Sequence, residues 1–290
     1  MKDYIIITDA SADIDAAFYK EHDIPILPMS YTLGSEMREC RTMESPELLY
    51  SFYENQKNGE LTQTTQINPF QYEELITPYM EKGVDVLYLA LSSGLTSTVD
   101  SAMMAAENLK EQFPDTVFRV LDTRAATGGI GILLERAFRN KAAGMSMDEN
   151  YADLEDCINH LWHWFLVDDL MYLKRGGRIG ASSAIVGTML SIKPLLTIEP
   201  DGRLSNFDKV RGTKAAARKL IEFYDQHHTD NDVDPVYICH AAADSTADIL
   251  EEGVLKITPN VRVTKMLLTP IIGAHVGPGM ASIIQVGKAK

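Results

Sequence analysis

The first half of the chain alternates short apolar runs with amphipathic segments that carry helix-capping signals. The apolar runs are rich in β-branched and aromatic residues, which is typical of strands buried on both faces. Two of the intervening segments begin at Ser45-Pro46 and Asn68-Pro69, and both end at a glycine, as capped helices do. Strands separated by helices favour a parallel sheet covered on both faces. The strands expected here are residues 4–9, 24–31, 84–91 and 117–122, and the helices are 45–59, 68–83, 97–112, 127–144 and 147–164.

The second half has a different pattern, which begins with two β-rich runs around the turn signal Pro200-Asp201-Gly202-Arg203. A hairpin followed by single strands and helices favours a mixed or antiparallel sheet with helices against it. We place the boundary between two α/β domains near Phe165, which divides the chain into residues 1–165 and 166–290. The later strands are expected at residues 235–241, 261–270 and 281–287, with helices at 213–228 and 244–257.

Composition and charge narrow the range of partners. The chain has 290 residues, of which 45% are hydrophobic and 23% charged, as in ordinary globular proteins. A net charge of −14 disfavours nucleic acid and anionic lipid surfaces, so neither is an expected partner. No stretch approaches the roughly 18 apolar residues of a membrane span, and no signal-peptide pattern precedes the first strand. Three scattered cysteines indicate a reducing compartment, so we expect a cytoplasmic protein.

A dense cluster of hydroxyls follows the strand expected at residues 84–91. Six Ser and Thr residues lie within residues 92–101, without any Lys, Arg, His or Glu. A loop at this edge of a parallel sheet is where open α/β folds bind ligands, and the following helix N-terminus favours an anion. Hydroxyls donate hydrogen bonds to an anion without being activated, so the loop predicts binding rather than catalysis. Helix capping explains one or two of these residues but not all six.

Three other stretches have a similar character. Residues 61–69 hold three threonines before a helix, residues 173–184 hold paired glycines between basic residues, and residues 273–282 hold His275 in a glycine-rich turn. Glycine allows a backbone to approach a ligand closely. Each stretch taken alone is equally compatible with a capped helix, a solvated basic loop or a tight turn.

Taken together, these stretches resemble the DegV family of fatty-acid-binding proteins over almost the whole chain. The resemblance implies an N-terminal three-layer α/β/α domain with a parallel sheet and a C-terminal two-layer α/β domain with a mixed sheet. It also implies a buried fatty acid whose carboxylate is held at the domain junction. The matching stretches, in order, are TDASAD (8–13), TTQINPFQY (64–72), SSGLTSTVDSA (92–102), VLDTRAATGGIGIL (120–133), YLKRGGRIG (172–180), LSIKPLLTIEPDG (190–202), KVRGTKAA (209–216) and GAHVGPG (273–279).

The resemblance further implies a carrier without catalytic turnover or cofactor. Such a carrier presents its fatty acid to a partner fatty acid kinase, which phosphorylates the carboxyl group for phospholipid metabolism. The chain departs from the family pattern at Ala10, at Thr65 and in Thr96-Ser97-Thr98, which bears on fine specificity more than on binding. Carried over position by position, the carboxylate-binding residues are Thr64, Thr65, Ser93, Arg178 and His275.

The acyl chain is expected to supply most of the affinity. Burial of one methylene stabilises by ~0.8 kcal/mol, so a chain of about 14 methylenes gains ~11 kcal/mol before ordering losses. A hydrogen bond to the charged head adds only ~1.5–3 kcal/mol. Candidates for an apolar channel, which are equally compatible with ordinary core packing, are Ile185, Val186, Met189, Leu190, Ile192 and Leu195.

Two other functions compete with lipid binding. Cys157, His160 and His163 recur at three-residue spacing on an expected helix, but the first and last are rotated apart by about 240°. Because no matched pair follows at zinc-type spacing, we expect no metal site. A small hydrolase using Ser93 as nucleophile and His275 as base is the alternative function, although no Gly-x-Ser-x-Gly elbow surrounds Ser93.

Overall fold

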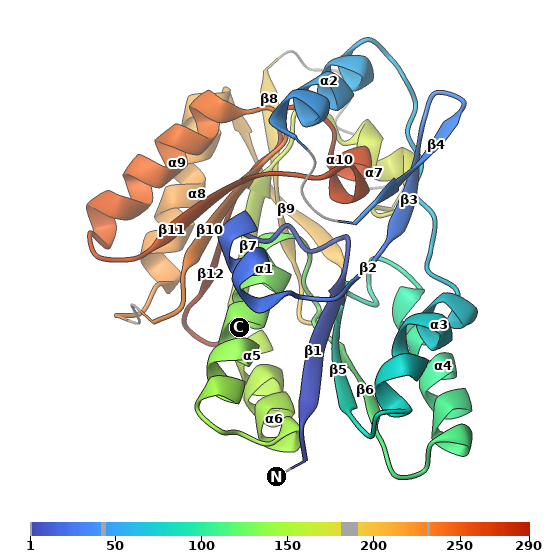
Figure 1. The fold of residues 1–290 in the computed structure, drawn as a ribbon. Helices are drawn as coiled ribbons and strands as arrows, with labels where there is room; N and C mark the ends of the chain where they lie inside the picture. Colours follow the sequence, from blue (N-terminus) through green and yellow to red (C-terminus); the bar gives the residue numbers. More distant parts are fainter. Residues whose placement is uncertain (1, 42–44, 181–190, 231–232) are drawn as a thin grey trace.

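The computed structural model describes residues 2–41, 45–180, 191–230 and 233–290 (Figure 1). Within these ranges it contains a parallel four-stranded sheet, a separate mixed six-stranded sheet and a two-stranded hairpin. The expected α/β fold class, with a parallel sheet in the first part and a mixed sheet in the second, is therefore confirmed.

The parallel sheet is covered by helices on both faces. Helices α3 and α4 pack on one face, and α5 and α6 pack on the other (Figure 1). The strands, in spatial order, are β2 (Ile26–Leu27), β1 (Tyr4–Asp9), β5 (Asp85–Ala90) and β6 (Phe118–Asp122). The helices are α3 (Pro69–Met80), α4 (Thr98–Gln112), α5 (Gly128–Ala142) and α6 (Met147–Ile158), and a short helix α1 (Ala16–His22) follows β1.

The six-stranded sheet carries α8 and α9 on one face and α5 on the other (Figure 1). Its β10 and β11 are parallel, and its remaining neighbours are antiparallel. In spatial order the strands are β11 (Val263–Leu267), β10 (Val236–His240), β12 (Ala281–Val286), β7 (Leu161–Leu166), β8 (Ile192–Ile198) and β9 (Leu204–Arg211), with α8 (Thr213–His227) and α9 (Asp244–Ile257).

Helix α5 lies between the two sheets and contacts strands of both. Its sequence from Gly128 to Glu135 is buried without interruption, and this is the pattern of a helix enclosed on all sides. The glycines of its first turn allow close packing, because a Cβ at Gly128 would overlap the ring of Tyr237 on β10. This helix joins the two sheets into one hydrophobic core.

The helix predicted over residues 147–164 is wrong in its last part. Helix α6 ends at Ile158, and residues from Leu161 form β7. This segment pairs with β12 and β8, which lie far away in the sequence, so long-range pairing overrides the local helical pattern. Phe165, where the sequence places the domain boundary, lies inside β7 of the six-stranded sheet. Sheet membership alone does not divide a chain into domains, so the boundary stays a prediction.

The strand predicted over residues 24–31 is two shorter strands. Pro28 separates β2 from β3 (Met29–Leu33), since proline lacks the N–H that a continuous ladder needs. Strand β3 then turns through Gly34, which has a φ of +60°, into β4 (Glu36–Cys40). The resulting hairpin stands apart from both larger sheets (Figure 1).

Several local predictions are confirmed. Ser45 caps α2 (Pro46–Lys57) by accepting from the N–H of Leu48, and Asn68 forms a capping box at the start of α3. The hairpin of β8 and β9 turns at Gly202, whose φ is +80°. These features depend on local sequence and survive in the fold.

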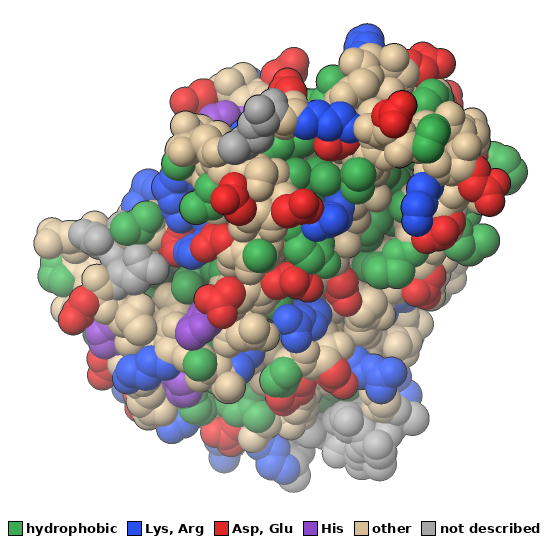
Figure 2. All heavy atoms as spheres, turned by 90° about the horizontal axis from the view of Figure 1, so that it is seen from below, with side chains coloured by type: hydrophobic (Ala, Val, Ile, Leu, Met, Phe, Trp, Pro, Cys, Tyr) green, Lys and Arg blue, Asp and Glu red, His purple; other side chains and the backbone are tan. Residues whose placement is uncertain are grey.

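The face of the molecule in Figure 2 has acidic and basic side chains interspersed among apolar ones. It carries no continuous basic area of the kind that binds nucleic acid. In the part of the chain that the structure describes, none of the helices has the length and apolarity needed to cross a membrane.

Candidate functional site

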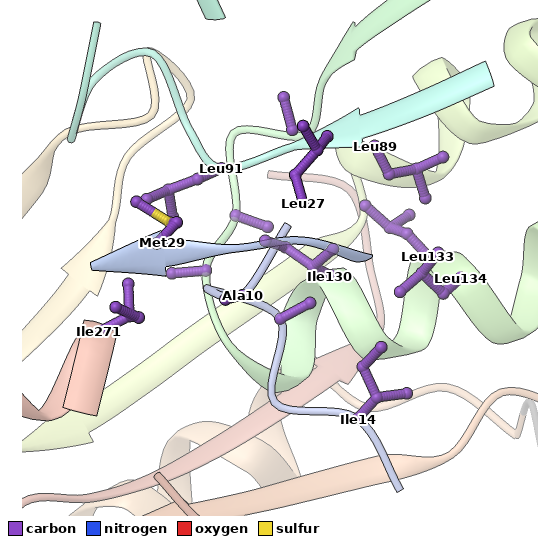
Figure 3. Close-up of a cluster of buried hydrophobic side chains, with 14 of the residues drawn as sticks. Ala10, Ile14, Leu27, Met29, Leu89, Leu91, Ile130, Leu133, Leu134 and Ile271 are labelled. Carbon is purple, nitrogen blue, oxygen red and sulfur yellow. The ribbon is translucent and has the colours of Figure 1, made fainter. Parts of the chain in front are cut away.

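A largely apolar cavity lies where the two halves of the chain meet. It has a volume of about 80 Å³ and is partly open to solvent. Figure 3 shows three of its wall residues beside the core, Met29, Leu91 and Ile271. The other apolar wall residues are Leu95, Ala126, Phe165, Leu173, Ile198, Leu204, Ile272, Val276, Met280 and Ile284.

One end of the cavity is polar, and Thr64 forms part of it. The segment that carries Thr64 runs antiparallel beside β3. The N–H of Thr32 donates to the carbonyl of Gln63 at 2.8 Å, and the N–H of Thr65 donates to the carbonyl of Ser30 at 2.9 Å. This pairing fixes the backbone on both sides of Thr64, so its side chain has a defined position at the cavity wall.

His275 lies opposite, in the last turn of α10 (Pro270–Val276), and not in the glycine-rich turn that the sequence predicts. The helix is held at its start by buried Asp13, whose Oδ1 accepts from the N–H of Thr269 at 2.8 Å. The Nε2 atom of His275 is 2.9 Å from the hydroxyl of Thr64. Burial and the nearby Arg178 lower the pKa of His275 to about 4, so its imidazole is neutral at neutral pH.

Arg178 follows the short helix α7 (Met171–Arg175) and completes this end of the cavity. Its Nε donates to the carbonyl of Leu95 at 3.1 Å, and one terminal nitrogen donates to the carbonyl of Gly176. Burial lowers the pKa of Arg178, yet a guanidinium remains charged at neutral pH. Among the ion pairs of the described residues, none includes Arg178. The cavity therefore contains a half-buried cation that no carboxylate of the described residues neutralises.

The hydroxyl loop presents its side chains in three directions. Ser92 is buried, and its hydroxyl donates to the carbonyl of Gly202 at 2.7 Å. Ser93 is exposed, and its hydroxyl and N–H donate to the carboxylate of Asp122 at 2.5 and 3.1 Å. Thr96 lines the cavity, with its hydroxyl oxygen 2.9 Å from that of Thr98.

Comparison with known proteins identifies the family of this chain. The sequence model described as "uncharacterised protein, DegV family" matches residues 4–288. The chain belongs to the DegV family. A DegV domain-containing protein of Clostridium perfringens is 33% identical over 290 residues, which cover 100% of this chain and 99% of that one. Another, from Lactococcus lactis, is 35% identical and covers 98% of this chain and 97% of its own.

Solved DegV-family structures have the same fold. A protein of Thermotoga maritima described as a DegV lipid-binding protein matches with a TM-score of 0.85 and 28% identity, over 100% of both chains. DegV of Bacillus subtilis, described as a fatty-acid-binding protein, matches with a TM-score of 0.80 and 25% identity. That match covers 99% of this chain and 100% of the other.

Of the carboxylate-binding residues that DegV resemblance predicts, Thr64, Thr65, Arg178 and His275 line the cavity. Ser93 does not, because its side chain turns outward to Asp122 while the loop returns toward the cavity at Thr96. Sequence reasoning singled out the loop but not the residue of it that faces the cavity. Polar wall residues that it did not assign are Gln66, Thr96, Thr127, His163 and Ser282.

Only two of the residues predicted to form the acyl channel lie in the described part of the chain, Ile192 and Leu195. Ile185, Val186, Met189 and Leu190 lie outside the described residues. Ile192 is half-buried at the start of β8 and is not part of the cavity wall. Leu195 packs under α8 with Trp164 and Leu166, on the sheet face opposite the cavity, so its assignment to the channel is wrong.

The described residues do not form the geometry that a metal site at Cys157, His160 and His163 or a hydrolase using Ser93 and His275 would need. Cys157 lies in the last turn of α6, His160 lies in the turn after the helix and His163 lies in β7, so the three do not share a helix. No group of three potential metal ligands occurs among the described residues. The hydroxyl of Ser93 bonds to Asp122 and the ring of His275 bonds to Thr64, so these two do not form the nucleophile–base pair of a hydrolase.

Proposed function

We propose that this protein binds one long-chain fatty acid in the cavity, with the carboxylate at the end formed by Thr64, Thr65, Arg178 and His275. The observation that carries the proposal is Arg178, a half-buried guanidinium beside an apolar cavity that pairs with no carboxylate in the described part of the chain. An unpaired charge taken out of water is costly, whereas a bound carboxylate would satisfy it with charge-assisted hydrogen bonds. A fatty acid supplies that carboxylate and fills the apolar space behind it.

The surrounding groups suit a carboxylate rather than a cation. Thr64 and neutral His275 bond to each other, so one hydrogen of this pair remains that can be donated to a carboxylate. The hydroxyl of Thr65, which donates to the carbonyl of Ser30 at 3.4 Å, can donate to the ligand instead. Thr96 comes to the same wall from the loop whose Leu95 carbonyl holds Arg178. The related Thermotoga and Bacillus proteins, which are described as lipid-binding and fatty-acid-binding, support this ligand class.

We further propose that the protein is a cytoplasmic carrier that presents the carboxylate to a partner fatty acid kinase and performs no turnover itself. A second hollow adjoins the polar end of the cavity and shares Thr64, Arg178 and His275 with it. Its other walls include Tyr172 and Arg175. A hollow at the head-group end supports presentation of the carboxyl group to another protein. The division into domains 1–165 and 166–290 is proposed with the fatty acid at their junction.

The test compares a carboxylate with a neutral head group. Delipidated protein is titrated with palmitate and with the alcohol of the same chain length, after mass spectrometry of an organic extract of the purified protein. We expect a fatty acid in the extract and a preference of about 10- to 100-fold for palmitate over the alcohol.

Arg178→Met should abolish this preference while binding of the alcohol remains. Arg175→Met is the matched control, because Arg175 is exposed, stacks over Tyr172 and lies outside the cavity wall. Equal affinity of wild type for palmitate and the alcohol, or an unchanged preference in Arg178→Met, would overturn the proposed head-group site.

A further inference from the structure

A second polar group lies in the cavity wall away from the head-group end. His163, on β7, is 3% exposed and lines the cavity, but it does not border the outer hollow that Thr64, Arg178 and His275 share. Neither of its ring nitrogens has a hydrogen-bond partner among the described residues. Buried polar groups are nearly always hydrogen-bonded, so an imidazole in a cavity wall without partners among the described residues calls for an explanation.

The chain makes room for this ring. A Cβ at Gly129, in the first turn of α5, would overlap Nε2 of His163. Burial lowers the pKa of His163 to about 3, and the backbone of Ala126 approaches the ring without reaching hydrogen-bond geometry. The ring is therefore neutral, with one nitrogen that donates and one that accepts.

Two hydroxyls share the same region of the wall. Strand β12 pairs with β7 so that Ser282 lies opposite Phe165 and Ile284 lies opposite His163. Because side chains alternate along a strand, all four lie on one face of the sheet, and all four line the cavity. The Ser282 hydroxyl already donates to the carbonyl of Cys239 at 3.1 Å.

Thr127 contributes the other hydroxyl. It is buried in the cavity wall at the start of α5, with a φ of +53°, which is strained for a β-branched residue. Its oxygen makes no hydrogen bond among the described residues, although Asp13 and Cys239 lie nearby. Three polar groups thus interrupt a wall that a plain hydrocarbon chain would contact.

We propose that this inner region, formed by Thr127, His163 and Ser282, is a subsite for an oxygen carried on the acyl chain, so that hydroxy fatty acids are preferred ligands. A hydroxyl both donates and accepts, and so it can pair with either nitrogen of the neutral imidazole. A saturated chain without oxygen leaves the ring nitrogens of His163 and the hydroxyl of Thr127 without a partner among the described residues, whereas Ser282 already bonds to Cys239. The inference rests on the proposed function and adds to it the class of fatty acid.

The experiment measures the affinity of wild type and His163→Phe for stearate and for hydroxystearates that carry the hydroxyl at successive positions. We expect at least one hydroxystearate to bind wild type about three- to tenfold more tightly than stearate. In His163→Phe that preference should vanish while stearate still binds. Wild type that binds no isomer more tightly than stearate, or a preference that persists in His163→Phe, would overturn the inference.

A second measurement tests the subsite in wild type alone, so its result does not depend on the folding of His163→Phe. In wild type labelled at histidine, the ring resonances of His163 should shift on binding of the preferred hydroxystearate and stay near their ligand-free positions on binding of stearate. Equal shifts with both ligands would contradict the subsite. Stearate binding separates the two proposals: a protein that binds stearate without preferring any isomer keeps the proposed function and loses only this inference. A protein that binds no acid loses both.

Discussion

The hydroxyl of Thr64 and Nε2 of His275 lie 2.9 Å apart, although 211 residues separate them in the chain. They meet because both elements contact β3. The segment that carries Thr64 pairs with this strand, and α10, which carries His275, packs against it. The proposed head-group site therefore forms only when residues from the two halves of the chain come together in the fold.

This contact predicts energetic coupling between the two residues. Thr64→Val and His275→Phe should each weaken palmitate binding, because each removes one hydrogen-bonding group and leaves its partner unsatisfied. The double variant should lose less than the sum of the two single effects, with a coupling of about 0.5–1.5 kcal/mol. Titration of palmitate into all four proteins checks this, and additive losses would contradict a working contact.

The hydroxyl loop gives a prediction that separates two residues. Thr96→Val should weaken palmitate binding by about tenfold, since Thr96 lines the cavity and a hydrogen bond to a charged group contributes ~1.5–3 kcal/mol. Ser93→Ala should leave affinity nearly unchanged, because its hydroxyl faces Asp122. The assignment of Ser93 as a head-group ligand, which follows from family resemblance, predicts the reverse order. Palmitate titrations of both variants, with thermal melts to verify folding, decide between the two.

Close approach of two loops gives a stability prediction. A Cβ at Gly94 would overlap the backbone of Gly202 in the turn between β8 and β9. Gly94→Ala must push these loops apart, and overpacking of this kind costs about 1–3 kcal/mol. Ser97→Ala in the same loop is the control, because Ser97 is exposed and its side chain caps nothing. Chemical denaturation should show a lower free energy of unfolding for Gly94→Ala only, and equal stabilities would refute the close approach.

Asp13 should make stability depend on pH. Burial raises the pKa of its carboxyl from 3.8 to about 6. Between these values the folded protein holds a proton that the unfolded chain has released, so this contribution to stability falls as pH rises from about 4 to about 6. The total change is of the order of 2–3 kcal/mol.

The comparison with Asp13→Asn isolates this effect. His163 and His275 have lowered pKa values and act with opposite sign over a similar range, but they are the same in both proteins. The free energy of unfolding of wild type, measured relative to the variant by denaturation, should decrease between pH 4 and pH 6. A difference that stays constant with pH would show that Asp13 is not desolvated as its burial indicates.

The sequence by itself determined the features whose causes are local. Ser45 and Asn68 cap their helices because a short polar side chain next to proline satisfies free N–H groups wherever the helix lies. The turn at Gly202 and the apolar strands of the parallel sheet follow from residue type and spacing in the same way. The polar stretches that carry Thr64, Arg178 and His275 were also recognisable in the sequence, and these three residues line one cavity.

Tertiary structure decided what depends on distant partners. Residues 161–166 form a strand because β12 and β8 offer hydrogen bonds on both sides, although their own pattern continues a helix. Once that strand exists, its alternation turns His163 toward the cavity and Trp164 toward α8, a choice that no local signal contains. The direction of Ser93 is set likewise by Asp122, which lies on a different strand. The residue types of the hydroxyl loop indicated a binding site, but long-range packing determined that the hydroxyl of Thr96, and not that of Ser93, faces the cavity.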